Sequence, residues 1–160
     1  MSSNPGAQVP PPAVGRHYLL PGQRVVSSYP YEITTVLGTC IAVCLWDPHS
    51  GAGGMNHYLL PHRLDGEASW RFGGTAIPGL IAEVRSLAGP HAKLMAKVFG
   101  GMQARHGTPV SRDLGLGNAK LAFEILEAEH IPVLASDIGG LRGRKLIFSL
   151  PQGEALVKYL

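Results

Sequence analysis

The stretch TTVLGTCIAVCLWDPHSGAGGMNHYLLP, residues 34–61, predicts a β-hairpin at the centre of the fold. Residues 40–46 form a continuous apolar run of the length of a strand, and residues 55–61 form a second run that ends at a proline. Residues 47–50, with the sequence DPHS, lie between the runs and have turn chemistry. An aspartate can bond its own backbone, and a proline presets the φ angle of the second turn position.

The length of this turn decides which residues of the two strands lie opposite each other. If residues 47–50 form the loop, Trp46 faces Gly51, and counting back along antiparallel strands places Cys40 opposite His57. Opposed residues share a face of the sheet with Cβ atoms about 4.5 to 5.5 Å apart, which leaves thiol and imidazole within contact. A slip of one residue would place them on opposite faces, and the GAGG segment could hold a bulge that changes the register.

A thiol beside an imidazole is the arrangement that activates cysteine nucleophiles. A free cysteine is only about a few per cent thiolate at neutral pH, whereas a neighbouring imidazole can take the thiol proton. Cys40 could then attack a carboxamide or ester carbonyl and form an acyl-enzyme, and His57 could protonate the leaving group. Gly38 would allow close approach of a substrate, and backbone N–H groups around Cys40 could form an oxyanion site. The polar residues nearby that could orient the imidazole are Thr34, Thr35, Thr39 and Asn56.

Structural roles remain open for the same residue types. Cysteine is among the most buried residues, and Cys44, inside the apolar run, is expected to fill the core. In an extended strand Cys40 and Cys44 are too far apart for a disulfide, and without a CxxC spacing or a nearby histidine pair they predict no structural zinc site. The GLGNAK segment at 115–120 lacks the lysine and hydroxyl placement of a P-loop, so no nucleotide or other cofactor is predicted.

The composition is that of one globular domain. The chain has 160 residues, of which 45% are hydrophobic and 16% charged. The 14 basic and 11 acidic residues are spread along the chain, without the like-charged runs of nucleic-acid-binding arms. Apolar stretches are shorter than the roughly 20 residues that span a bilayer, and the N-terminus lacks the order of a signal peptide. We therefore expect a cytoplasmic protein that binds no nucleic acid and does not insert into a membrane.

The chain divides into a tail and one domain. Residues 1–15 contain four prolines and few large apolar groups, so they are expected to form a flexible tail, followed by a single domain over residues 16–160. Apolar spacing predicts a helix over 74–89, with Thr75 as a possible cap and Pro78 tolerable only near its first turn. A second helix is predicted within 114–133. Strands are predicted at 24–28, 93–101 and 132–136 and in a C-terminal hairpin around 151–153. This pattern indicates an α+β or mixed α/β fold.

Several motifs, taken together and in order, resemble those of the CheD chemoreceptor glutamine deamidases. TTVLGTCIAVCLWDP is similar to the nucleophile segment of that family, and GGMNHYLLP is similar to its histidine segment. AKVFGG, LGLGNAKLAFEILEAEHIPVLASDIGGLRGRKLIF and GEALVKYL follow in the family order, so the resemblance covers roughly residues 17–160. Two departures occur. Thr39 stands where the family commonly has serine, and RFGGTAIPGL, with Pro78, differs from the usual start of the first helix.

The resemblance implies a fold, a reaction and a set of site residues. It implies that Cys40 is the nucleophile, that His57 is the general base and acid, and that Thr34 is the third member, which helps hold the histidine. Family members hydrolyse glutamine side chains of methyl-accepting chemotaxis receptors to glutamate, and some also remove receptor methyl esters. The implied fold places β-sheet layers beside helices, similar to Cys-His deamidating toxins. The phosphatase CheC is an expected partner.

Two functions are consistent with these patterns. The first is a protein-glutamine deamidase that works through a Cys-His thioester. The second is a regulatory module with little catalysis, which uses the same surface to bind CheC or the receptor. Proteases and transglutaminases share the Cys-His pair, so the pair alone does not select the substrate.

Overall fold

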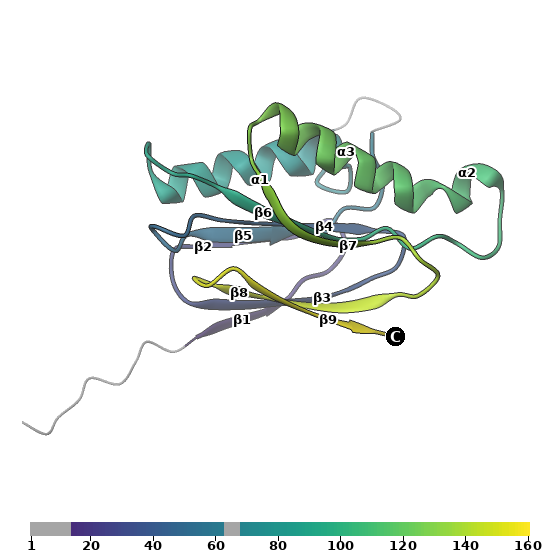
Figure 1. The fold of residues 1–160 in the computed structure, drawn as a ribbon, viewed down its shortest axis with the longest axis horizontal. Coiled ribbons are helices and arrows are strands. Elements are labelled where there is room, and N and C mark those ends of the chain that lie inside the picture. Colours follow the sequence, from purple (N-terminus) through teal and green to yellow (C-terminus); the bar gives the residue numbers. More distant parts are fainter. Residues whose placement is uncertain (1–13, 63–67) are drawn as a thin grey trace, which may run out of the picture.

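The computed structural model describes residues 14–62 and 68–160, which form two stacked β-sheets and a layer of helices (Figure 1). The outer sheet has the order β1-β3-β8-β9 and comprises β1 (Gly15–Tyr18), β3 (Tyr31–Leu37), β8 (Arg144–Leu150) and β9 (Glu154–Tyr159). The inner sheet has the order β2-β5-β4-β6-β7 and comprises β2 (Arg24–Ser27), β5 (Gly53–Asn56), β4 (Ile41–Trp46), β6 (Met95–Gly100) and β7 (Val133–Ile138). The helices are α1 (Gly73–Ala88), α2 (Pro109–Arg112) and α3 (Leu114–Ala128). The α+β class is confirmed.

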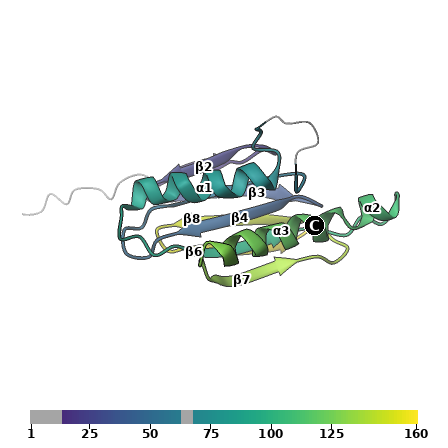
Figure 2. The same cartoon turned by 90° about the horizontal axis from the view of Figure 1, so that it is seen from above.

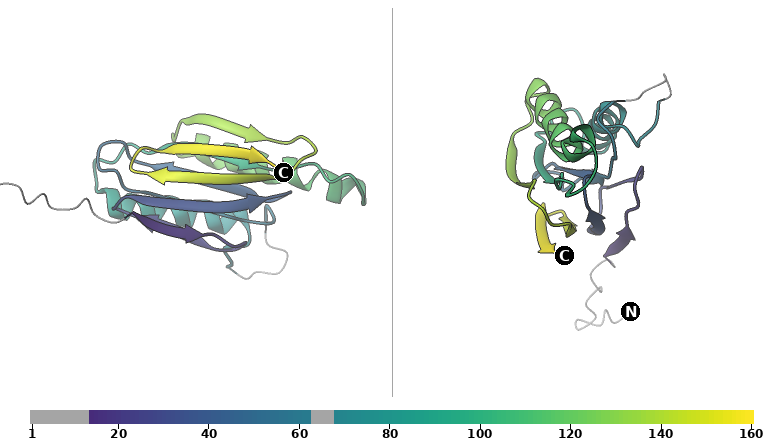
Figure 3. Two further views of the ribbon diagram at one scale, coloured as in Figure 1. Left: turned by 90° about the horizontal axis from the view of Figure 1, so that it is seen from below. Right: turned by 90° about the vertical axis from the view of Figure 1, so that its right-hand side faces the viewer.

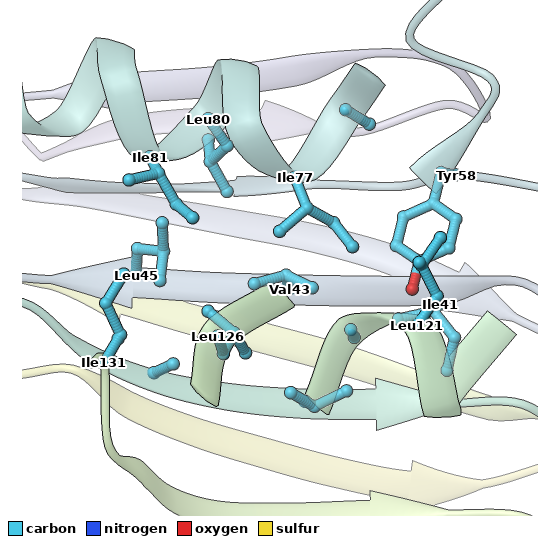
Figure 4. Packing of buried hydrophobic residues seen from close by; sticks show 14 of the residues in the cluster. Ile41, Val43, Leu45, Tyr58, Ile77, Leu80, Ile81, Leu121, Leu126 and Ile131 are labelled. Atoms are coloured by element: carbon cyan, nitrogen blue, oxygen red, sulfur yellow. The ribbon is translucent and has the colours of Figure 1, made fainter. Parts of the chain in front are cut away.

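Strand β4 lies at the centre of the inner sheet and is buried on both faces. Successive side chains of a strand point to opposite faces, so the apolar run predicted as a strand is divided between two cores. The core under the helices, shown in Figure 4, contains Ile41, Val43 and Leu45. The core between the two sheets contains Ala42, Cys44 and Trp46. Position along β4 therefore decides which core a residue joins.

Helices α1 and α3 lie side by side over the inner sheet, α1 above β2 and β5 and α3 above β6 and β7 (Figure 2). Helix α1 begins at Gly73, so Thr75 lies inside the helix and is not its cap, and Pro78 lies beyond the first turn. The prediction that Thr75 caps the helix was wrong, because the first N–H groups of α1 bond main-chain carbonyl oxygens and not a side chain. The Gly73 and Gly74 N–H groups donate to the carbonyl oxygens of residues 60 and 61, at 2.8 and 2.9 Å.

Most of the predicted strands are confirmed. Strands occur at or within 24–28, 40–46 and 93–101, at β7, and in the C-terminal hairpin of β8 and β9. The strand predicted over 55–61 ends at Asn56. Beyond it the backbone finds other partners, since the His57 N–H donates to Gln23 O (3.2 Å) and the Leu59 N–H to Arg71 O (2.8 Å). Strands β1 and β3 have no counterpart among the predictions.

The outer sheet turns one face toward solvent, and no helix of the described residues covers it (Figure 3). The tail predicted over residues 1–15 lies outside the described residues except for its last two positions, and Gly15 already belongs to β1. Strand β1 pairs in parallel with β3. Among the described residues, no helix is long and apolar enough to cross a membrane.

Candidate active site

The hairpin that carries Cys40 and His57 is present, but its register differs from the predicted one by two residues. Trp46 pairs with Gly53, where the sequence predicted Gly51. A shift of two residues preserves the side of the sheet on which each residue lies. Cys40 and His57 therefore share a face as diagonal neighbours and not as a directly opposed pair. Diagonal Cα atoms are about 7 to 8 Å apart, a distance that a ring side chain can bridge.

The register shifted because the loop is longer than the four residues of the predicted turn. The Asp47 N–H donates to Ala52 O and the Gly51 N–H to Asp47 O, both at 2.8 Å, so the loop continues through Ala52. Gly51 has a φ angle of +78°, in the left-handed region that favours glycine. The Asp47 carboxylate accepts hydrogen bonds from the main chain and hydroxyl of Ser50, at 3.3 and 2.8 Å, and closes the turn as its chemistry predicted.

The pair lies between the two sheets at one end of β4. Ile41 bridges to Tyr58, and both side chains are buried on the helical side of the inner sheet. Their neighbours Cys40 and His57 consequently face the outer sheet. Cys40 packs against the core between the sheets, and His57 contacts Thr35 of β3.

Hydrogen bonding fixes the tautomer of His57. The Thr35 Oγ1 lies 2.8 Å from His57 Nδ1 and 2.7 Å from the main-chain oxygen of Leu19. A carbonyl oxygen can only accept, so the single hydroxyl proton of Thr35 is donated to Leu19. Thr35 must therefore accept from His57, and Nδ1 carries the imidazole proton. The other ring nitrogen, Nε2, is left with a free lone pair.

Nε2 of His57 is buried and has no hydrogen-bond partner among the described residues. The whole residue is 2% exposed, and burial lowers its pKa from 6.5 to about 4. The imidazole is thus neutral at physiological pH, with an unprotonated nitrogen on the side of the sheet that Cys40 shares. This is the protonation state that a general base needs.

The two cysteines have different environments. Cys40 is half-buried and Cys44 is fully buried, and both are free thiols. Burial raises the pKa of Cys40, while its own backbone N–H opposes this rise by stabilising the thiolate. Burial also raises the pKa of Cys44, which has the environment of a core residue, as expected. Of these two thiols, Cys40 is therefore the one with partial access to solvent.

The loop before β4 is held from the end of β6. The Gly101 N–H donates to Cys40 O, and the Met102 N–H donates to Gly38 O, both at 2.9 Å. A Cβ atom at Gly100 would lie 2.2 Å from Cys40 O, so only glycine permits this approach. The glycine pair at the end of β6, Gly100 and Gly101, thus packs against the backbone that carries the thiol.

The hydroxyl that bonds His57 belongs to Thr35, whereas the family resemblance implied that Thr34 helps hold the histidine. Adjacent residues of a strand point to opposite faces, and it is Thr35 that faces inward from β3 and bonds the imidazole. The groove on the outer face of the outer sheet is lined by Arg16, His17, Tyr18, Glu32, Thr34 and Lys145. Thr34 therefore lies on the far side of β3 from the Cys40 and His57 pair.

The other polar candidates have structural partners. Asn56 accepts from the Val43 N–H at 2.9 Å and donates to Ala76 O at 3.2 Å, so its amide ties β4 to α1. The carbonyl of Thr39 accepts a hydrogen bond from Asn118 of α3, at 3.1 Å. Asn118 was not predicted as a site residue; its only signal in the sequence was a polar residue within the buried face of a helix.

No metal centre is built from the described residues. Within residues 14–62 and 68–160, no group of three or more His, Cys, Asp or Glu side chains is arranged to hold a metal ion.

The family model and the relatives that match this chain all belong to one family. The model of the family described as "CheD chemotactic sensory transduction" matches residues 59–159. The chain is 48% identical over 143 residues to a probable chemoreceptor glutamine deamidase CheD 1 of Anaeromyxobacter dehalogenans, covering 89% of this chain and 84% of that protein. It is 39% identical over 145 residues to a probable chemoreceptor glutamine deamidase CheD of Trichlorobacter lovleyi, covering 90% of each. A protein of the same name from Rhodospirillum rubrum is 41% identical over 141 residues, covering 88% of this chain and 80% of that protein.

Proposed function

Because the chain belongs to the CheD family, we propose that it is a hydrolase that converts glutamine side chains of chemotaxis receptors to glutamate. The relatives in this family are named chemoreceptor glutamine deamidases. One observation in the structure supports this reaction above the others. The hydrogen bond from His57 to Thr35 leaves a buried, neutral Nε2 on the face that His57 shares with the Cys40 thiol.

In the proposed mechanism, Cys40 is the nucleophile and His57 moves its proton. Sγ attacks the carboxamide carbon of the glutamine, and the thiol proton passes to Nε2 of His57. Nε2–H then protonates the departing nitrogen, the C–N bond breaks, and ammonia leaves a thioester on Cys40. His57 next takes a proton from water, whose oxygen attacks the thioester carbon. The C–S bond breaks, the thiolate regains that proton, and glutamate is released.

The resting pair is neutral in this scheme. Burial lowers the pKa of His57 and raises that of Cys40, and both changes favour imidazole and thiol over an ion pair. The proton therefore moves as the carbon–sulfur bond forms. The Cys40 N–H, which stabilises negative charge at Sγ, is the candidate donor to the developing oxyanion.

Further proposals extend this reaction. A methyl ester on the receptor would follow the same thioester route with methanol as the leaving group, so methylesterase activity is included. A CheC-type phosphatase is proposed as a partner on the basis of the family resemblance. We place the reaction in the cytoplasm, where free thiols remain reduced.

The test is mass spectrometry of receptor cytoplasmic fragments incubated with the wild-type protein, Cys40→Ala or Cys44→Ala. We expect the mass gain of carboxamide-to-carboxylate conversion with wild type and Cys44→Ala and no gain with Cys40→Ala. Conversion by folded Cys40→Ala would refute the nucleophile. No conversion by folded wild-type protein would refute the deamidase, and receptor binding without turnover would then identify the regulatory module.

A further inference from the structure

Asn118 lies on α3, yet its side chain binds both segments that carry the reacting pair. Its amide nitrogen donates to Thr39 O at 3.1 Å and to Leu59 O at 2.8 Å, and the residue is fully buried. Thr39 immediately precedes Cys40, and Leu59 lies two residues after His57. Both N–H bonds of one planar amide are therefore used to join the two segments.

The amide lies where the hydrogen-bonded ladder between the two segments opens. Ile41 and Tyr58 exchange two main-chain hydrogen bonds, at 3.1 and 3.0 Å. The ladder does not continue toward the site, because the Leu60 N–H donates to Arg71 O instead. A continued antiparallel ladder would pair Thr39 with Leu60, so the Thr39 carbonyl lacks its main-chain partner across the gap. The Asn118 amide supplies that missing donor and also binds the carbonyl of Leu59.

Helix α3 is fixed at this point by two further contacts. The Tyr58 hydroxyl donates to the main-chain oxygen of Asn118 at 2.6 Å. Gly115, one turn earlier on the same face of α3, packs against the loop after β6, where a Cβ atom would lie 2.4 Å from Gly101 O and 2.5 Å from Met102 O. Figure 4 shows Tyr58 beside Ile41 and Leu121, the last of which belongs to this helix. The donor amide is thus held by a rigid element.

We propose that Asn118 is a positioning residue that sets the separation between Cys40 and His57, an inference that rests on their proposed role as the reacting pair. Two carbonyl oxygens cannot bond each other, so the spacing of the two segments depends on the donors between them. The Oδ1 atom of Asn118 is buried without a partner among the described residues. Such an atom costs stability, and the two hydrogen bonds that the amide nitrogen donates offset that cost.

The test uses Asn118→Leu, which removes both donors while keeping a side chain of similar shape. The readout is the rate of Cys40 alkylation by iodoacetamide at neutral pH, assigned to the residue by peptide mass spectrometry. The His57-dependent part of this rate is obtained by comparison with His57→Ala. We expect Asn118→Leu to lower that part at least about tenfold, because small displacements of reacting groups cost factors of this size.

A double variant separates positioning from a general structural effect. If Asn118 acts through the geometry of the pair, Asn118→Leu has no further effect on alkylation in the His57→Ala background. An equal loss in both backgrounds would overturn the proposal. Leu126→Ala is the matched control, since Leu126 is fully buried near the other end of α3. It is expected to lower thermal stability while keeping the wild-type alkylation rate.

The proposal remains testable if Asn118→Leu does not fold. In the wild-type protein, the side-chain amide resonances of Asn118 should then shift when Cys40 is alkylated, and unchanged resonances would overturn the proposal. Because alkylation needs no receptor, these results are independent of deamidation. If the effect of Asn118→Leu on Cys40 alkylation depends on His57 but the protein does not deamidate receptor, the proposed function is refuted and the positioning role of Asn118 is kept.

Discussion

Replacing Thr35 by valine should disable His57 while leaving a folded protein. Valine keeps the shape of threonine but removes the hydroxyl that accepts from His57 Nδ1 and donates to Leu19 O. Thr35 is fully buried and His57 is 2% exposed, so water cannot easily replace the lost partner. Each buried polar group left unpaired costs about 1 to 3 kcal/mol, so the two groups together predict a loss of roughly 2 to 6 kcal/mol of stability.

The effect on activity follows from the same cost. An unpaired Nδ1–H makes the alternative tautomer, with the proton on Nε2, more favourable by about 1 to 3 kcal/mol. At 1.4 kcal/mol per tenfold change, the ratio of the tautomer with a free Nε2 to the tautomer with a protonated Nε2 falls by a factor of about 5 to 150 relative to wild type. Because the active fraction falls by no more than this ratio does, we expect kcat for receptor deamidation to fall by at most this factor and KM to change little. Thr35→Ser, which keeps the hydroxyl, should retain most of the activity.

Thr34→Val is the matched control, since it is the same change at the neighbouring position on the opposite face of β3. It should alter stability by no more than about 0.5 kcal/mol, as is usual for substitutions that remove no buried contact, and kcat should stay at the wild-type value. Ammonia release measures kcat, and urea unfolding measures stability. A large loss of activity in Thr34→Val, with Thr35→Val unaffected, would refute the tautomer argument and restore the role that the family resemblance implied for Thr34.

Three further predictions concern pH, the second thiol and helix docking. In a pH-rate profile, the acid limb of kcat/KM should lie near pH 4, because burial lowers the pKa of His57 to about 4; a limb near pH 6.5 would contradict this. The contribution of His57 to the free energy of unfolding should be complete above pH 6.5 and should decrease as the pH falls toward 4. Cys44→Ala should keep full deamidase activity and lose only stability, measured by thermal unfolding, because its thiol is buried in the core; loss of activity in a folded protein would contradict its structural role. Gly115→Ala should destabilise the protein and slow Cys40 alkylation, because its Cβ would meet backbone oxygen at 2.4 Å; a wild-type alkylation rate would show that α3 does not control the loop.

The sequence was sufficient to place the pair on one face but not to set its register. The apolar run identified β4, and the Asp47 turn identified the hairpin, because both signals are local. The loop extends through Ala52, which moved the register by two residues. Since the side-chain period of a strand is also two, the shared face of Cys40 and His57 survived the error.

Identifying the hydroxyl that bonds His57 required information that local patterns do not contain. Choosing between Thr34 and Thr35 depends on which face of β3 packs against the inner sheet, and β3 belongs to a different sheet from His57. Asn118 binds residues 79 and 59 positions away in the chain, so no spacing rule could connect them. The contacts of Thr35 and of Asn118 both depend on how the two sheets and the helix layer pack together.

The Leu19 carbonyl has a consequence for how this site can vary between relatives. The acceptor that orients the Thr35 hydroxyl is a main-chain atom, so any residue at position 19 supplies it as long as the backbone keeps its path. That path is held by the Leu19 N–H, which donates to Thr34 O at 2.7 Å. Substituting the Leu19 side chain therefore leaves the hydrogen bond between the Thr35 hydroxyl and the Leu19 carbonyl in place. A comparison of side chains among relatives would overlook this hydrogen bond. Replacing the amide between residues 19 and 20 by an ester would weaken the Leu19 carbonyl as an acceptor and so test the bond directly.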